Sequence, residues 1–303
     1  MHEPEESALQ ARTKPLNQSL AKARALISLT KPLQTLLLLV TGICAYTLSR
    51  PGQVLGYELL GGGIALAGSI GGCTALNMVL DRDIDAKMSR TVRRPLPDGR
   101  LAVRTATVFG LLLAGSGLIL AWLLSPLFGA VVTAGLVIDL VVYTAWLKRR
   151  TPLSILWGGI SGGMPALAGR ALATGRLDVV GVLLAAGVLL WIPAHILTLS
   201  THYAQEYKKA QVPVWPNVFG LTATRRLVAG ASILNTVALG AAGWLLHIHP
   251  FALWTMTLQG VILSGIAIVA LLRPSKKLNW YLFKAASLYM LGAFICLTVG
   301  TVI

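Results

Sequence analysis

The chain has 303 residues, of which 55% are hydrophobic and only 12% are charged, and its mean hydropathy is +0.71. Soluble domains carry about a quarter charged residues, so this composition excludes an ordinary soluble protein and favours a helical membrane protein. Anionic lipid headgroups account for much of the net charge of +15, and we therefore expect no nucleic-acid partner.

Long apolar segments recur from Pro32 to the C-terminus and predict nine transmembrane helices in an all-α, polytopic fold. The predicted spans are residues 33–49, 58–79, 104–123, 127–147, 153–173, 178–198, 226–246, 250–272 and 280–302. Because no soluble domain is inserted, residues 31–303 are predicted to form one transmembrane domain. A polar tail, residues 1–30, precedes it and is predicted to end in an interfacial helix.

Basic residues are distributed unevenly between the two sides of the predicted bundle. The N-terminal tail and the connections after every second span carry 23 of the 26 lysines and arginines, which leaves Arg50, Arg170 and Arg176 on the other side. The positive-inside rule places the basic side in the cytoplasm. We therefore expect a multi-pass protein of the cell (plasma) membrane with a cytoplasmic N-terminus and an external C-terminus.

The segment after the second span, TALNMVLDRDIDAKMSRTVRRPLPDGRL (74–101), is both the most basic and the most acidic connection. Asn77, Asp81 and Asp85 are four residues apart, so a helix running through them would carry all three on one face, and Asp83 would point elsewhere. Oxygen ligands of this kind suit Mg²⁺ that shares its shell with substrate phosphates. The alternative is a solvated helix end whose acids pair with Arg82, Lys87 and Arg90.

Two basic clusters are predicted to reach the same membrane face. One consists of Arg90, Arg93 and Arg94 before the turn PLPDG, and the other of Lys148, Arg149 and Arg150 in YTAWLKRRT (143–151). Arginine forks suit phosphate oxygens. Each cluster by itself is explained by headgroup anchoring, but together with the carboxylates they predict a site for a diphosphate that carries a hydrophobic tail.

Several stretches resemble the UbiA superfamily of intramembrane prenyltransferases. NMVLDRDIDAKMSRTVRRPLPDGRL (77–101) is similar to its first signature, in the form found in the protoheme IX farnesyltransferase (heme O synthase) subfamily. Further stretches agree in order and spacing: LTKPLQTLLLLVTG (29–42), YTAWLKRRTPLSILWGGISGGMPALAGRALATG (143–175) and LLWIPAHILTLSTHYAQEYKKAQVPVWPNVFG (189–220). The resemblance covers residues 28–220.

This resemblance implies nine helices around a central cavity with the active site near the cytoplasmic face. It also implies the reaction, in which a Mg²⁺-bound prenyl diphosphate ionises and the allylic cation alkylates an acceptor. Asn77, Asp81 and Asp85 would bind the diphosphate through Mg²⁺, and Lys31, Arg94 and Lys148 would hold its oxygens. Arg90, Arg93, Arg149 and Tyr207 are further candidate substrate-binding residues.

The stretch 189–220 resembles the family's second signature but departs from it in part. Heme O synthases carry an acidic pair before the tyrosine, whereas this chain has Gln205 and Glu206 before Tyr207. Glu206, with His202 one helical turn earlier, is predicted either to take a second Mg²⁺ or to be a single weaker ligand. IPAHI (192–196) also replaces the family's usual two prolines and aromatic residue, which weakens the case for a heme acceptor.

Two further polar groups lie inside apolar spans. Asp139, with Tyr143 four residues later, either positions or deprotonates the acceptor, or forms a buried hydrogen bond to Tyr143 or a neighbouring helix. His195 either contacts the acceptor, including a heme iron, or is a packing residue. Cys44, Cys73 and Cys296 are predicted to be inert core residues.

Heme B is the preferred acceptor from subfamily similarity. An aromatic acid of the 4-hydroxybenzoate type, as in ubiquinone biosynthesis, and a lipid glycerol phosphate of the archaeal type are the alternatives. A transporter is the non-enzyme alternative, but it would place polar residues near the bilayer midplane rather than at one face. A lipid- or heme-binding assembly factor would not need the Asn77–Asp81–Asp85 arrangement.

Overall fold

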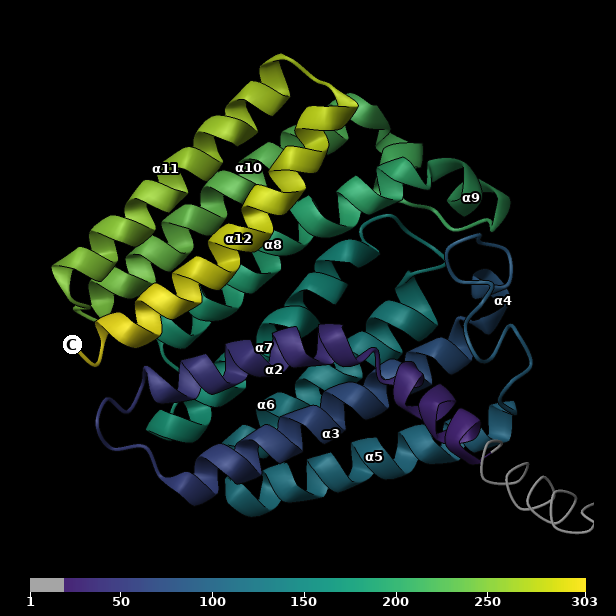
Figure 1. Ribbon diagram of the computed structural model, residues 1–303, viewed down its shortest axis with the longest axis horizontal. Helices are drawn as coiled ribbons and strands as arrows, with labels where there is room; N and C mark the ends of the chain where they lie inside the picture. The colour runs from purple at the N-terminus through teal and green to yellow at the C-terminus, as the bar shows by residue number, and fades with distance from the viewer. Residues whose placement is uncertain (1–18) are drawn as a thin grey trace, which may run out of the picture.

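The computed structural model describes residues 19–303, which are helical with short connections (Figure 1). A helix at Ser19–Leu29 is followed, after a 47° bend, by α2 (Pro32–Thr47). The other long helices are α3 (Gly56–Leu80), α5 (Val103–Leu124), α6 (Pro126–Val137) with its π-helical continuation η1 (Ile138–Leu147), α7 (Ser154–Thr174), α8 (Val179–His202), α10 (Trp215–Leu245), α11 (Pro250–Leu272) and α12 (Lys276–Gly300). Two short helices, α4 (Arg82–Asp85) and α9 (Ala204–Lys209), lie between them.

A helix is present at each of the nine predicted spans. Within residues 19–303, seven helices are long and apolar enough to cross a membrane, and the bent pair at residues 19–47 raises that number to eight. The remaining helix, α7, is rich in small residues and packs against α2, α6 and α8. A helix that is largely covered by its neighbours needs less apolar surface toward lipid, which explains its lower hydropathy.

Helix starts follow local capping chemistry. The Ser125 hydroxyl, before Pro126, accepts from the Phe128 amide, and Asp178 accepts from the Gly181 amide at 2.9 Å. The seventh span was predicted to begin at residue 226, and α10 begins before it, at Trp215. Gly220 interrupts α10 with a φ of 78°, a conformation that glycine adopts without strain, and the part of α10 that continues through the predicted span follows this break.

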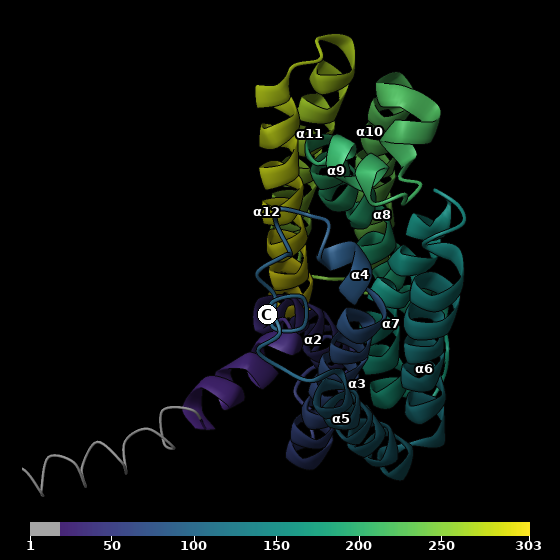
Figure 2. The ribbon, with the colours of Figure 1, turned by 90° about the vertical axis from the view of Figure 1, so that its right-hand side faces the viewer.

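The helices form two groups that lie side by side (Figures 1 and 2). One group comprises α2, α3, α5, α6 and α7, and the other comprises α8, α10, α11 and α12. Close approach of backbones fixes the first group: a Cβ at Gly169 of α7 would lie 2.0 Å from the Gly42 carbonyl oxygen of α2, and one at Gly117 of α5 would lie 2.4 Å from the Ser69 amide of α3. Such contacts hold α3, which carries Asn77, in a defined position.

One end of the bundle carries the short helices. Figure 1 shows α4, α9 and the α11–α12 connection at this end, with the C-terminus at the other. Helix α4 belongs to the first half of the chain and α9 to the second, and a small core of Ile84, Met88, Ala210 and Val212 joins them. The connection 86–102 also packs Leu96 against the helix Ser19–Leu29. Segments distant in the sequence therefore enclose one region at this end.

Candidate active site

The acidic residues after α3 keep a helical spacing despite a break in the helix. Helix α3 ends at Leu80, and α4 begins immediately after Asp81, whose φ and ψ are −90° and 1°. The Asp81 amide donates to the Asn77 carbonyl and the Asp85 amide to the Asp81 carbonyl, at 2.9 and 2.8 Å. Asp81 and Asp85 are 7% and 5% exposed, whereas Asp83 is exposed. The break therefore leaves two carboxylates facing inward.

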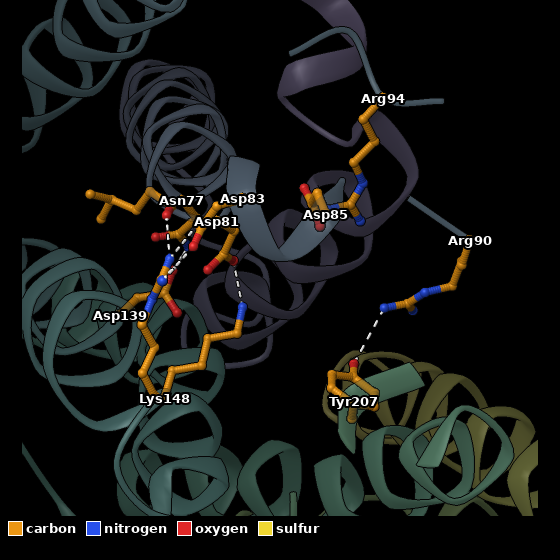
Figure 3. Close-up of polar contacts among 11 residues, drawn as sticks. Asn77, Asp81, Asp83, Asp85, Arg90, Arg94, Asp139, Lys148 and Tyr207 are labelled. Carbon is orange, nitrogen blue, oxygen red and sulfur yellow. Dashed lines mark hydrogen bonds and ion pairs between the residues drawn. The ribbon is translucent and has the colours of Figure 1, made fainter. Parts of the chain in front are cut away.

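A cation from another segment pairs with each buried carboxylate (Figure 3). The Lys148 ammonium, just after η1, donates to Asp81 Oδ2. The Arg94 guanidinium donates through Nη1 to both oxygens of Asp85, at 2.9 and 2.7 Å. Buried charges require such partners, because an isolated charge in a low-dielectric environment is strongly unfavourable.

Two oxygen atoms in this cluster have no partner among the described residues. Asn77 Oδ1 and Asp81 Oδ1 are both buried and accept no hydrogen bond. Leaving one such atom unsatisfied costs about 1–3 kcal/mol, so the pair is suited to a bound cation. Within residues 19–303 no three His, Cys, Asp or Glu side chains converge as a closed metal site. An amide oxygen and a carboxylate oxygen are the kind of sparse oxygen donor set that suits Mg²⁺, which binds through one or two carboxylates and completes its shell with water and substrate phosphates.

Asp139 lies beside Asn77 rather than against Tyr143. Its carboxylate accepts from Asn77 Nδ2 at 2.5 Å, and from Cys73 Sγ and Ser161 Oγ at 3.2 Å each. Of the two buried hydrogen bonds that the sequence suggested, the one to a neighbouring helix is present. The Tyr143 ring instead lies under the Lys148 ammonium, at 5.6 Å.

The π-helical form of η1 explains why Asp139 and Lys148 reach the same region. Nine residues separate them, which is about two and a half turns of an α-helix and would place them on opposite faces. Hydrogen bonds from residue i to i+5 widen each turn, as in the bond from the Lys148 amide to the Tyr143 carbonyl. Nine residues then make about two turns, and both side chains lie on one face.

Three residues near Asp139 were not predicted from the sequence as part of the site. Thr144 and Ser161 were not singled out, and Cys73 was assigned no role. Thr144 is 2% exposed and its hydroxyl has no partner in residues 19–303. It follows Asp139 by five residues, one turn of a π-helix, so it belongs to the same face. Ser161 and Cys73, which was predicted to be inert, both donate to Asp139. No hydropathy pattern identifies these residues, because each is a small residue within an apolar span.

Lys31 is the N-cap of α2, at the bend after Ser19–Leu29, and adopts a left-handed backbone conformation with a φ of 44°. Its ammonium lies within electrostatic range of Asp81, Asp139, Arg94 and Lys148. Among residues 19–303 it makes no ion pair or side-chain hydrogen bond. The structure therefore places Lys31 with the inward-facing charges.

Other predicted binding residues lie outside this cluster. Arg149 forms an exposed, two-fold hydrogen-bonded pair with Asp83, with distances of 2.7 Å to both carboxylate oxygens. The hydrogen bonds from Arg149 lower the pKa of Asp83 to about 2. The Arg93 side chain is exposed. Lys148 and Arg149 are adjacent in sequence, and only Lys148 faces the buried carboxylates.

The second signature supplies a contact between the two halves of the chain. Both carboxylate oxygens of Glu206 accept from Ser89, one from its amide and one from its hydroxyl, at 2.7 Å each. These two bonds lower the pKa of Glu206. Arg90 donates to the Tyr207 hydroxyl at 3.4 Å and lies over the Tyr203 ring. His202 is exposed and its ring packs edge-on against Tyr203.

His195 lies apart from the charged cluster, in a row of stacked rings between α8 and α12. Its imidazole stacks on Trp191 at 4.8 Å and on Phe283 at 4.7 Å, and Phe283 stacks on Trp280. His195 is therefore packed on both ring faces, and its buried Nδ1 lacks a partner among residues 19–303.

Two kinds of sequence comparison agree on the family. The profile of the UbiA prenyltransferase family matches residues 38–294. A protoheme IX farnesyltransferase of Korarchaeum cryptofilum is 43% identical over 71% of this chain and 73% of its own length. Another, of Archaeoglobus fulgidus, is 38% identical over 92% of this chain and 98% of its own length.

Solved structures share the fold at low sequence identity. A digeranylgeranylglyceryl phosphate synthase aligns over 93% of this chain and 99% of its own, with a TM-score of 0.78 and 17% identity. A UbiA homolog from Archaeoglobus fulgidus, bound to GPP and Mg²⁺, aligns over 90% of this chain and 99% of its own, with a TM-score of 0.67 and 13% identity. The helical arrangement described above is therefore that of the UbiA fold.

Proposed function

Because this chain belongs to the UbiA prenyltransferase family, we propose that it transfers a farnesyl chain from farnesyl diphosphate to heme B. Family membership leaves the transporter alternative without support. The relatives named protoheme IX farnesyltransferase match along most of this chain, and they favour heme B over an aromatic acid or a lipid glycerol phosphate.

The observation that carries the proposal is the pair of buried, unpartnered oxygens, Asn77 Oδ1 and Asp81 Oδ1. They lie one helical turn apart at one end of the bundle, next to the cations Lys31, Arg94 and Lys148. An anchor for lipid headgroups would need only the cations. Oxygens and cations together suit one ligand, a diphosphate that the cations bind directly and the oxygens bind through Mg²⁺.

Asn77, Asp81 and Asp85 would hold Mg²⁺, which supplies Lewis-acid stabilisation of the departing diphosphate. Lys148 and Arg94 now pair with Asp81 and Asp85. With the diphosphate bound, the same two cations would be available to its phosphate oxygens. Cations held in place before the reaction stabilise the charge that develops on the leaving group, which lowers the barrier more than it strengthens substrate binding.

The acceptor site is proposed to lie toward His195, in a central cavity between the two helix groups. The unpartnered Nδ1 of His195 suits contact with the acceptor, including a heme iron, and the stacked rings of Trp191 and Phe283 suit a flat apolar molecule. Apolar surroundings also exclude water from the allylic cation. Glu206 would bind a second Mg²⁺, with or without His202, only after releasing Ser89.

The purified protein tests this function directly. It is incubated with labelled farnesyl diphosphate and Mg²⁺, and with heme B, 4-hydroxybenzoate or a glycerol phosphate lipid as acceptor, and the product is identified by mass. We expect farnesylated heme and release of one diphosphate per product. Transfer to another acceptor alone would refute heme B, and absence of any Mg²⁺-dependent transfer would refute the assigned reaction.

We also propose that α7 is the ninth span and that the α4–α9 end faces the cytoplasm of the cell membrane. The basic connections gather at this end, and at the opposite end Arg50 and Arg170 are paired with Glu58 and Asp178. Single cysteines placed in the 86–102 connection and at the C-terminus of a cysteine-free variant report the orientation. A membrane-impermeant thiol reagent added to intact cells is expected to label only the C-terminal cysteine.

A further inference from the structure

Asp139 has a set of contacts that differs from those of Asp81, Asp83 and Asp85. Three neutral donors hold its carboxylate, Asn77 and Cys73 from α3 and Ser161 from α7. Asp81, Asp83 and Asp85 each pair with a cation instead. Asp139 therefore forms hydrogen bonds with neutral side chains of neighbouring helices and forms no ion pair among the described residues.

The contact with Asn77 determines which way that carboxamide faces. A carboxylate accepts hydrogen bonds and donates none, so the Asn77 NH₂ group must face Asp139, as the 2.5 Å contact shows. The carbonyl oxygen of the same planar group then points the other way. It is this atom, Asn77 Oδ1, that is buried and unpartnered, as is Asp81 Oδ1 one helical turn further on.

The π-helix supplies the geometry. Asp139 lies at the first turn of η1, and the wide turns bring it to the face that also carries Thr144 and Lys148. Ser161, whose hydroxyl also bonds the Gly158 carbonyl, steadies the second oxygen of the carboxylate from α7. Three helices thus fix Asp139, and Asp139 fixes the Asn77 amide.

We propose that Asp139 is a positioning residue that orients the Asn77 carboxamide so that Oδ1 serves as a ligand of the divalent cation. This role rests on the proposed function, and it differs from proton removal or contact with the acceptor. Outer-shell carboxylates that orient a metal ligand are worth about 10–100-fold in metal affinity. Asp139 is expected to contribute within that range although it does not touch the metal.

The test measures metal binding rather than turnover. Mn²⁺, a paramagnetic substitute for Mg²⁺, is titrated into the detergent-solubilised full chain with inorganic diphosphate present, and free Mn²⁺ is followed by electron paramagnetic resonance. Asp139→Ala is expected to weaken binding by about tenfold or more. Asp139→Asn keeps an acceptor for the Asn77 NH₂ group, so it is expected to retain most of the affinity. If both variants bind like the wild type, the positioning role is wrong, and equal losses in both would also overturn it.

A double-mutant cycle separates positioning from a general effect on folding. If Asp139 acts through Asn77, adding Asp139→Ala to Asn77→Ala should weaken Mn²⁺ binding no further. Ser161→Ala gives a graded comparison, because it removes one of the hydrogen bonds to Asp139 and leaves the Asn77 contact; its affinity is expected to fall less than that of Asp139→Ala. Additive losses in the cycle would refute the inference. If Asp139→Ala does not fold, Asp139→Leu replaces it, because leucine fills a similar volume without an acceptor for Asn77; it should lose affinity, and wild-type affinity in it would refute the inference.

Failure of this inference is distinguishable from failure of the proposed function. If the wild type binds no Mn²⁺ in the presence of diphosphate, the metal-dependent function itself is wrong. If the wild type binds and the Asp139 variants match it, only the positioning role is wrong. A base that removes a proton from the acceptor would give a third pattern, in which both Asp139 variants lose turnover and keep metal affinity.

Discussion

Two acidic regions meet at one end of the bundle, and they use their carboxylates differently. At the α3–α4 junction, Asp81 is buried, pairs with Lys148 through one oxygen and leaves the other free. At the α8–α9 junction, both oxygens of Glu206 are engaged by Ser89, and His202 is exposed. A buried oxygen without a partner can bind a cation without first breaking an existing contact, and Asp81 has such an oxygen whereas Glu206 has none. The structure therefore favours the first region as the metal site and the second as a connection between the chain halves.

The largest effect is expected from Asp81→Ala compared with Asp83→Ala. Asp81 offers the unpaired oxygen and holds Lys148, so its loss should reduce the rate of the chemical step by a factor on the order of 10²–10³ or more. Asp83 points outward to Arg149, and its loss should leave turnover within a few-fold of wild type. Single-turnover kinetics in nanodiscs measure both rates. Equal losses would remove the distinction between inward- and outward-facing acids.

Lys148→Ala compared with Arg149→Ala tests the same distinction with two adjacent cations. Lys148→Ala removes a charge that stabilises the leaving diphosphate, and a slowing on the order of 10²-fold is expected. Arg149→Ala breaks the exposed pair with Asp83 and a hydrogen bond to the Leu80 carbonyl, neither of which reaches the buried carboxylates, so it should stay within a few-fold of wild type. Both are measured with prenyl diphosphate saturating, so that binding does not mask the chemical step. A comparable loss in Arg149→Ala would place it in the site after all.

A smaller effect is expected at the second region. Glu206→Gln can still pair with Ser89, because its NH₂ group can donate to the Ser89 hydroxyl, but it loses the charge that strengthens both bonds. The contact between α9 and the 86–102 connection should weaken, and turnover should fall at most several-fold. The Mg²⁺ concentration for half-maximal rate should stay unchanged, and Ser89→Ala should show the same pattern. An increased Mg²⁺ requirement in Glu206→Gln alone would show instead that Glu206 is a metal ligand.

The smallest effect is expected from the exposed Asp83–Arg149 pair and depends on pH. The pKa of Asp83, about 2 in the folded chain, lies below the usual value near 3.9. The pair therefore stabilises the fold above about pH 4 and loses this contribution as the pH falls toward 2. Because both side chains are largely exposed, Asp83→Asn should cost only a few tenths of a kcal/mol at pH 7. The melting temperatures of the two proteins should converge as the pH is lowered; a constant difference would contradict this origin.

The positions of the helices followed from sequence more closely than the contacts of the site residues. Apolar segments placed a helix at each predicted span, and α10 extends before its span across a break at Gly220. The expected spacing of Asn77, Asp81 and Asp85 on one face persists through the α3–α4 break. By contrast, an α-helical reading of residues 138–147 puts Asp139 and Lys148 on opposite faces, because no local pattern signals the wider turns of η1.

The sequence by itself determined the membrane class, the helical segments, the gathering of charge at one end and the family signature, because hydropathy, capping and motif spacing are local properties of the chain. Tertiary structure alone decided which polar groups meet. In the folded chain Lys148 pairs with the buried Asp81, whereas the adjacent Arg149 pairs with the exposed Asp83. Glu206 accepts from Ser89, and Asp139 accepts from Asn77. These contacts depend on how each helix is rotated about its axis and on how closely small residues let helices approach, and both are fixed by packing among segments far apart in the sequence.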